Sequence, residues 1–210
     1  MYATVPPPPQ RLLVFARLPE LGKVKTRLAA DLGDERALAI YRSMLHDVLL
    51  SIGESSEQTE IEVLWAPTPA ANGAALAIFD GYAVSMQTGE SLGDRLAMAF
   101  SERFFFHRTR KIIAIGVDDP RLPRELIDHA FALLDSCEWV VGPAADGGYY
   151  LIGCRAASYD TEVFMDVAWG TNSVLETTLA NIAALKGSVA LLPERMDIDT
   201  AEDMQRYGYE

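Results

Sequence analysis

The sequence predicts an α/β protein with three layers, α/β/α, around a mostly parallel central sheet. Short apolar runs alternate along the chain with longer amphipathic segments, which is the pattern of βαβ units. The 210 residues are 50% hydrophobic and 23% charged, an ordinary composition for a folded domain with a full core. We therefore expect a single domain over residues 11–210, preceded by a flexible, proline-rich tail over residues 1–10.

Apolar periodicity defines the elements in the first half of the chain. The run Leu12–Ala16 is too short for a helix and fits a strand buried on both faces. A stripe with a 3.6-residue period runs from Ala37 to Ile52 and predicts a helix that opens at Asp34. The later elements expected in this half are a strand at Glu60–Trp65, a weakly helical segment after residue 70, a strand at Tyr82–Met86 and a helix led by Glu90–Arg95.

The second half of the chain continues the same alternation. Strands are expected at Lys111–Val117, Glu138–Gly142, Tyr149–Gly153 and Ser188–Leu192, and helices at Leu122–Leu134, Thr171–Leu185 and Thr200–Arg206. Pro123 falls in the first turn of its helix, where a missing N–H costs little. Gly147 and Gly148 predict a tight turn, so the strand after them should return from the strand before them.

Charge and composition exclude several classes of function. With 18 basic and 30 acidic residues the chain has a formal net charge of -12, which repels nucleic acid. No apolar run approaches the roughly 20 residues of a membrane span, and the first residues lack the features of a signal peptide. We expect a cytoplasmic protein in which Cys137 and Cys154 are buried, reduced thiols. A homodimer is compatible with the sequence.

The segment Arg17–Arg27 concentrates positive charge directly after the first predicted strand. Its basic side chains are Arg17, Lys23, Lys25 and Arg27, and Gly22 would let the backbone approach a ligand closely. Ligands of parallel sheets bind beyond the carboxyl ends of the strands, so these donors suit the phosphates of a nucleotide. The alternative is a solvated basic loop paired with surface acids. A P-loop phosphotransferase is disfavoured because the GxxxxGK[ST] spacing is absent.

Carboxylates follow two later strands on the same predicted edge. Asp118 directly follows the central strand and is placed to bind Mg²⁺ or Mn²⁺, while Asp119 fits a helix cap or a supporting role beside it. Asp197 and Asp199 alternate along an extended segment and could complete the metal site, with Asp199 as our choice. Capping of the last helix by Asp199 and Thr200 is an equal alternative.

A third loop on this edge combines an aspartate with two glycines. Gly147 and Gly148 would admit a substrate against bare backbone, beyond their role in the turn. Asp146 could accept a hydrogen bond from a sugar hydroxyl or act as a general base. Trp169 lies in a loop where an aromatic ring can stack on a base or sugar, although packing is the more common role of tryptophan.

Short motifs that include the residues above are spread, in a fixed order, along nearly the whole chain. They are Arg17-x-Pro19-x-x-Gly22-x-x-Lys25-Thr26-Arg27, Gln87-x-Gly89, Leu92-Gly93-Asp94-Arg95, Gly116-x-Asp118-x-Pro120, Gly142-Pro-x-x-Asp146-Gly-Gly-Tyr149, Trp169-x-Thr171 and Asp197-x-Asp199-Thr200. As a set they resemble a family of uncharacterised transferases with the GT-A-like nucleotide-diphospho-sugar transferase fold. That family is related to the molybdenum-cofactor and 2-phospholactate guanylyltransferases. The chain departs from the family pattern at Val117 and Asp119, where small hydroxyl-bearing or thiol residues are common.

The resemblance implies a metal-dependent transferase that uses a nucleotide-sugar or nucleoside triphosphate donor and a small-molecule acceptor. It implies a nucleotide site made of Ala16, Arg17, Pro19, Gly22, Lys23, Lys25, Thr26, Arg27, Gln87 and Arg95. The acceptor or sugar site is expected at Asp146, Gly147, Gly148, Trp169 and Thr171, with Asp118 and Asp199 holding Mg²⁺ or Mn²⁺. Asp146 and Lys25 are the expected catalytic residues. A non-catalytic nucleotide- or anion-binding module with the same cleft is the alternative.

Overall fold

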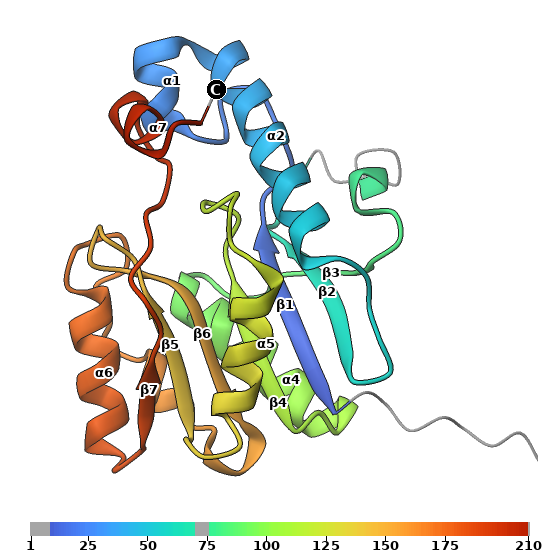
Figure 1. Ribbon diagram of the computed structural model, residues 1–210, viewed down its shortest axis with the longest axis vertical. Helices are drawn as coiled ribbons and strands as arrows, with labels where there is room; N and C mark the ends of the chain where they lie inside the picture. Colours follow the sequence, from blue (N-terminus) through green and yellow to red (C-terminus); the bar gives the residue numbers. More distant parts are fainter. Residues whose placement is uncertain (1–8, 70–75, 210) are drawn as a thin grey trace, which may run out of the picture.

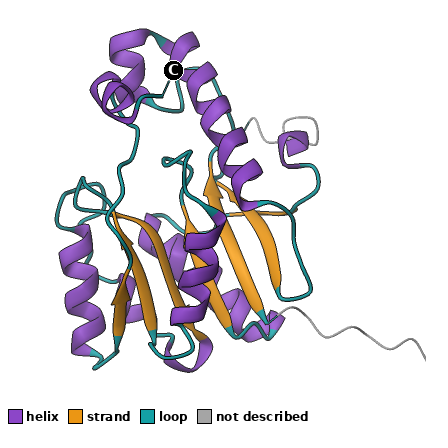
Figure 2. Cartoon of the chain, viewed as in Figure 1, coloured by secondary structure: helices purple, strands orange, loops and turns teal. Residues whose placement is uncertain are grey.

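The computed structural model describes residues 9–69 and 76–209 and has the predicted three-layer α/β/α architecture (Figures 1 and 2). A seven-stranded sheet with the order β3-β2-β1-β4-β6-β5-β7 forms the middle layer. Its strands are β1 Gln10–Ala16, β2 Thr59–Trp65, β3 Ala83–Met86, β4 Lys111–Ile115, β5 Trp139–Pro143, β6 Tyr149–Arg155 and β7 Val189–Leu191. Residues 1–8 of the predicted tail lie outside the described residues, and Gln10 already belongs to β1.

The sheet is parallel except around one strand. β1 pairs in parallel with β2 and β4, β2 with β3, and β5 with β7. β6 runs antiparallel to both of its neighbours, β4 and β5, because the turn at Gly147 and Gly148 reverses the chain, as predicted. The amino-terminal end of β6 therefore lies at the same edge of the sheet as the carboxyl ends of β1 and β4.

Helices cover both faces of the sheet (Figure 1). The described helices are α1 Thr26–Leu32, α2 Asp34–Ile52, α4 Leu92–His107, α5 Arg124–Leu133, α6 Val174–Ala184 and α7 Ala201–Tyr207, of which α1 and α7 lie beyond the sheet beside α2. One core cluster packs α2 and α5 against one face through residues such as Leu45 and Phe131, and a second packs α4 and α6 against the other through Phe100 and Ile182. A third, smaller cluster joins α1, α2 and α7.

The structure corrects several predicted boundaries. The cationic segment is a loop only as far as Lys25, because α1 begins at Thr26 and its residue Leu28 is buried. β4 ends at Ile115 rather than Val117. Pro123 is the N-cap of α5 and does not lie in its first turn. Most of the Ala-rich segment expected after residue 70 falls outside the described residues, and the described part contains a short 3₁₀ turn at Ala77–Phe79.

Two further predictions concern the state of the cysteines and the lack of a membrane span. Cys137 and Cys154 are both free thiols, as expected, but only Cys154 is buried, whereas Cys137 is half-buried near the surface end of its loop. Across residues 9–69 and 76–209, every helix is too short or too polar to cross a lipid bilayer.

An ionic cluster is buried where β1, β2 and α4 meet. Glu62 Oε2 accepts hydrogen bonds from Arg11 Nη1 at 2.8 Å and from Arg103 Nε at 3.1 Å, and Ser85 also donates to this carboxylate. The side chains of Arg11, Glu62 and Arg103 are only 5%, 7% and 4% exposed. Burial alone would raise the pKa of Glu62, but the hydrogen bonds from Arg103, Ser85 and Arg11 outweigh it and lower the pKa to about 2.

Candidate active site

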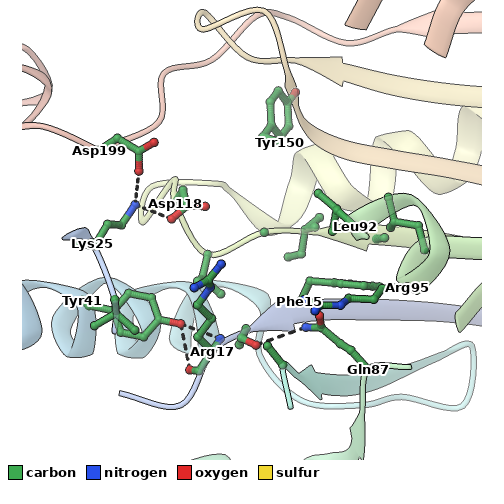
Figure 3. Close-up of a pocket in the computed structure, with 18 of the residues that line it drawn as sticks. Phe15, Arg17, Lys25, Tyr41, Gln87, Leu92, Arg95, Asp118, Tyr150 and Asp199 are labelled. Carbon is green, nitrogen blue, oxygen red and sulfur yellow. Dashed lines mark hydrogen bonds and ion pairs between the residues drawn. The ribbon is translucent and has the colours of Figure 1, made fainter. Parts of the chain in front are cut away.

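A cavity of about 460 Å³ opens at the carboxyl ends of β1 and β4 (Figure 3). The loop after β1 forms one wall, the start of α4 a second, and the beginning of β6 a third. The residues predicted from sequence that line it are Ala16, Arg17, Lys23, Lys25, Thr26, Arg27, Gln87, Arg95, Asp118 and Asp199. Its volume is within the usual range for small-molecule sites. Segments far apart in the chain thus converge where parallel-sheet proteins bind their ligands.

Tyr41 fixes the beginning of the cationic loop. Its hydroxyl accepts a hydrogen bond from the Arg17 backbone N–H at 2.8 Å and donates to the Arg17 carbonyl at 3.0 Å. Because Tyr41 is buried in α2, these two bonds hold the loop to a rigid element. The Arg17 side chain is left exposed, and its Nη1 donates a long hydrogen bond of 3.5 Å to the Lys23 carbonyl. Its guanidinium therefore remains free to bind an anion.

Lys25 turns inward from the same loop. Its backbone lies in the left-handed region, at φ 46° and ψ 47°, directly before α1. Its Nζ donates to the Ile198 carbonyl at 2.6 Å, to Asp199 Oδ1 at 2.8 Å, and to Asp118 Oδ1 (Figure 3). Burial would lower the pKa of Lys25, but the charges and hydrogen bonds of the two aspartates outweigh burial and raise it. Lys25 is thus a buried ammonium group held between two carboxylates.

The segment that carries Asp199 is itself pinned beside Asp118. The Ile198 N–H donates to the Asp118 carbonyl at 3.0 Å, and the Ile198 side chain is fully buried with α1, α2 and α7. Thr200 then caps α7 and forms a reciprocal capping box with Asp203. The two neighbouring residues therefore have separate roles. The Thr200 side chain caps α7, and the Asp199 side chain contacts Lys25 in the site.

Asp119 does not cap α5, which corrects one of the two roles predicted for it. Its carboxylate is buried and accepts hydrogen bonds from Arg195 Nε and from the Tyr207 hydroxyl. The Arg195 backbone also pairs with the loop after β5, with its N–H donating to the Pro143 carbonyl at 3.0 Å. Asp119 therefore ties the Asp118 loop to the segment leading into α7. Because Arg195 and Tyr207 lie far away from Asp119 in sequence, no local pattern could have revealed these two partners.

Gln87 and Arg95 form the wall of the cavity opposite Lys25. The Gln87 amide donates to the Leu64 carbonyl at 2.7 Å and to the Ala16 carbonyl at 3.3 Å, which joins the ends of β2 and β1. Arg95 Nε donates to the Gly89 carbonyl at 3.1 Å, and within the described chain its other guanidinium nitrogens have no partner. Gly89 has φ 130°, and a Cβ there would lie 2.6 Å from the Asp94 Cβ. Only glycine allows this tight entry into α4.

The residues predicted for the acceptor do not line the cavity and form a neighbouring wall. Asp146 is exposed, and its Oδ1 accepts the Gly148 N–H at 2.8 Å. A Cβ on Gly147 would lie 2.2 Å from the Asn172 carbonyl oxygen, so this turn packs against the loop before α6. Trp169 packs edge-to-face on Tyr149, with ring centroids 6.2 Å apart. Tyr149 lines the cavity and is therefore the contact between the two walls.

The remaining predicted residues also have defined places. Thr171 Oγ1 donates to the Ala168 carbonyl at 2.7 Å, which stabilises the turn before α6. Gly22 forms a turn at φ 69°. Pro19 and Gly22 lie in the cationic loop but outside the cavity lining. The cavity also has aromatic and apolar walls that the predicted site did not include: Phe15, Tyr41, Leu92, Tyr149 and Tyr150, of which Leu92 and Tyr149 belong to the quoted motifs. Their apolar periodicity is equally typical of core residues, so no sequence signal separated them.

The oxygen donors around Lys25 match the preference of a hard divalent cation. Carboxylate oxygens of Asp118 and Asp199 and the Ile198 carbonyl converge on one point, and Mg²⁺ and Mn²⁺ bind such oxygens. Asp197 lies close by, and its buried Oδ1 has no hydrogen-bond partner among the residues that the structure describes. Burial, together with the charges of Asp118, Asp146 and Asp199, raises the pKa of Asp197 to about 8. In the described residues, no three or more His, Cys, Asp or Glu side chains are grouped as metal ligands.

Comparison with known proteins identifies the family. Residues 51–171, more than half of the chain, match the DUF2064 family, described as an uncharacterized protein conserved in bacteria. A candidate nucleotide-diphospho-sugar transferase from Desulfovibrio desulfuricans G20 is 30% identical, with a TM-score of 0.89, over 95% of this chain and 86% of that chain. A search of curated proteins found no match.

More distant structures share the fold. A CMP:2-keto-3-deoxy-manno-octonic acid synthetase complexed with CTP is 10% identical, with a TM-score of 0.58, over 94% of this chain and 96% of that chain. A Mycobacterium tuberculosis H37Rv protein in complex with manganese is 18% identical, with a TM-score of 0.50, over 94% and 96% of the two chains. Fold and motifs agree with these matches, and the chain belongs to the DUF2064 family, with the architecture of the nucleotide-diphospho-sugar transferases.

Proposed function

We propose that this protein is a metal-dependent transferase that moves a glycosyl or nucleotidyl group from a nucleotide-sugar or nucleoside triphosphate to a small acceptor. The observation that carries the proposal is the single cavity in which the cationic loop faces Asp118 and Asp199. The similarity to the Desulfovibrio protein, itself a candidate nucleotide-diphospho-sugar transferase, supports the same class of reaction. The CTP and manganese complexes of more distant proteins with this fold are consistent with it.

Binding of the donor phosphates is assigned to the free cations of the cavity. Arg17 and Lys23 are exposed, and Arg95 presents guanidinium nitrogens that are unpaired in the described chain. Arginine binds phosphate through two parallel hydrogen bonds, whereas lysine acts as a point charge. In such reactions the protein contributes mainly positioning and charge neutralisation, so these side chains suit the developing negative charge.

The metal would be held by Asp118 and Asp199, whose oxygens already converge on a cation. When bound, Mg²⁺ or Mn²⁺ supplies charge neutralisation at the pyrophosphate of the donor. Lys25 is assigned to the same phosphates because it lines the cavity. Asp146 orients or deprotonates the acceptor from the wall formed with Trp169 and Thr171, next to the cavity residue Tyr149.

A thermal-shift panel tests this proposal. Nucleoside triphosphates and nucleotide-sugars are added with and without Mn²⁺, and the best hit is then incubated with candidate acceptors and analysed for product. We expect a metal-dependent rise in melting temperature for at least one donor class. Asp118→Ala should abolish that rise with little change in the melting temperature of the free protein, because Asp118 is 46% exposed in its side chain.

The matched control is Asp128→Ala, which removes an exposed carboxylate of α5 that pairs with Arg124. It should leave the ligand-induced shift unchanged. Unaltered shifts in Asp118→Ala would contradict the assigned site. Binding without any product, across the acceptors tested, would favour a non-catalytic nucleotide-binding module instead.

A further inference from the structure

The ammonium group of Lys25 occupies the point at which the oxygen donors of the site converge. Nζ lies 2.6 Å from the Ile198 carbonyl oxygen and 2.8 Å from Asp199 Oδ1, and it also contacts Asp118 Oδ1. The Lys25 side chain is 4% exposed, whereas those of Asp118 and Asp199 are 46% and 39% exposed. The cation is therefore enclosed, while both carboxylates keep a face toward solvent and the cavity.

The backbone of Lys25 sets this position. Left-handed φ and ψ values are uncommon for a residue with a side chain and are maintained only where the surroundings enforce them. Here Val24 and Leu28 are both buried, at 3% and 0% exposure, and anchor the chain on either side. The inward direction of Lys25 thus follows from the packing of the loop, in contrast to Arg27, whose side chain is 72% exposed.

From this arrangement we infer that Lys25 is a built-in counter-cation that competes with a divalent metal for Asp118 and Asp199. The identity of that metal, Mg²⁺ or Mn²⁺, rests on the proposed function. A metal ion at the point where these oxygens converge would take the Oδ1 atoms that Lys25 now holds, and two cations a few ångströms apart repel each other. The ammonium group must therefore move away before both aspartates can coordinate a metal through those oxygens.

Nucleotide phosphates would give the displaced ammonium a second partner. Lys25 lines the cavity together with Arg17 and Arg95, so an anion bound in the cavity would lie near the Lys25 side chain. A metal ion alone displaces Lys25 without offering it another anion, whereas a metal ion with phosphate offers both. Metal and nucleotide therefore bind cooperatively, and the metal alone binds weakly.

The affinity for Mn²⁺ alone tests this competition, measured from the paramagnetic resonance signal of free Mn²⁺. Lys25→Met removes the competing charge but keeps the length of the side chain, and we expect Mn²⁺ to bind at least about tenfold tighter, or about 1.4 kcal/mol. Arg27→Met is the matched control, because the Arg27 side chain is 72% exposed and its Nη1 lies 3.7 Å from Asp199 Oδ2. A screened surface cation of this kind should change the affinity less than about twofold.

A second variant and a second measurement guard against a folding defect. Lys25→Gln retains a hydrogen-bond donor without the charge and should behave like Lys25→Met. In both variants Mn²⁺ should raise the melting temperature more than it does in the wild type. Equal or weaker Mn²⁺ binding relative to Arg27→Met would overturn the inference, and so would the absence of Mn²⁺ binding in every variant.

The outcome is independent of the nucleotide panel. If Lys25→Met binds Mn²⁺ more tightly but the protein binds no nucleotide, the competition between Lys25 and the metal stands and the proposed transferase function is contradicted. If nucleotide binding depends on the metal but Lys25→Met leaves the affinity for Mn²⁺ unchanged, the proposed function stands and the competition is contradicted.

Discussion

Charged side chains of the same type have opposite roles in this protein, depending on the partners that folding brings to them. Arg17 is exposed at the mouth of the cavity, whereas Arg103 is buried and neutralised by Glu62. Glu62 in turn serves two arginines at once. The buried cluster is a structural device, because removal of one member would leave another charge in the interior without compensation.

Substitution of Glu62 by alanine should therefore destabilise the fold strongly. We expect a loss of about 3 kcal/mol in the free energy of unfolding, since Arg11 and Arg103 would remain buried with fewer acceptors. Urea denaturation measures this loss. Glu60→Ala is the control, because Glu60 pairs with the same Arg11 but is 29% exposed, and its loss should stay below about 1 kcal/mol. Similar losses in the two variants would show that burial of the cluster contributes little.

The same carboxylate makes stability depend on pH in a defined direction. The pKa of Glu62 is about 2 in the folded protein against 4.5 for the free side chain, so the folded state binds its proton less readily. This contribution is complete above about pH 4.5 and is lost as the pH falls toward 2. The difference in unfolding free energy between wild type and Glu62→Gln should thus shrink from about pH 6 to about pH 3. A constant difference would mean that the Glu62 carboxylate is not held in its charged form by the arginines.

At the scale of elements, the segment between β7 and α7 is held to the site by isolated contacts rather than by pairing as a strand. One isolated bridge joins Ala144 to Arg195, and the Arg195 guanidinium reaches the buried Asp119. The Ile198 N–H then donates to the Asp118 carbonyl. The position of Asp199 beside Asp118 thus rests on these few contacts, of which the pair between Asp119 and Arg195 is the ionic one.

Arg195→Met should loosen this segment before the rest of the molecule. The buried Asp119 carboxylate would lose its charged partner, a change on the order of 3 kcal/mol, and the backbone N–H of Ile198 should exchange with solvent faster. Hydrogen exchange followed by mass spectrometry detects this change, with β1 amides as an internal reference. Arg206→Met, which breaks an exposed pair with Glu202 on α7, should leave the Ile198 exchange rate unaltered. Uniform acceleration in all elements would indicate global destabilisation instead.

At the scale of the whole molecule, the alternation of strands and helices was predictable because it rests on local periodicity. The reversed strand β6 was predictable as well, since two consecutive glycines mark its turn. The edge of the sheet at which the site lies was also predictable, because ligands of parallel sheets bind beyond the carboxyl ends of the strands. The short helix α1 was not predicted, because only a left-handed Lys25 separates it from the loop.

The partners within the site could not be derived from local patterns. Lys25 bonds to a residue 174 positions away, and Asp119 contacts Arg195 across 76 positions. Sequence reasoning named Lys25, Asp118 and Asp199 for a shared site but assigned the lysine to phosphates rather than to the two aspartates. Charge type and position in the chain do not encode which of several cations is turned inward; the packing of Val24 and Leu28 does.

The contact between Lys25 and the 198–199 segment also has a consequence for the order in which the chain is synthesised. Lys25 and Asp118 leave the ribosome long before Asp199 does, and chains fold from the N-terminal side as they emerge. Until the last of the three appears, the ammonium group has a single carboxylate and no Ile198 carbonyl to enclose it. The nascent protein can thus form much of its sheet before the 198–199 segment is available, and the contacts around the Lys25 ammonium group are completed only when that segment packs beside Asp118.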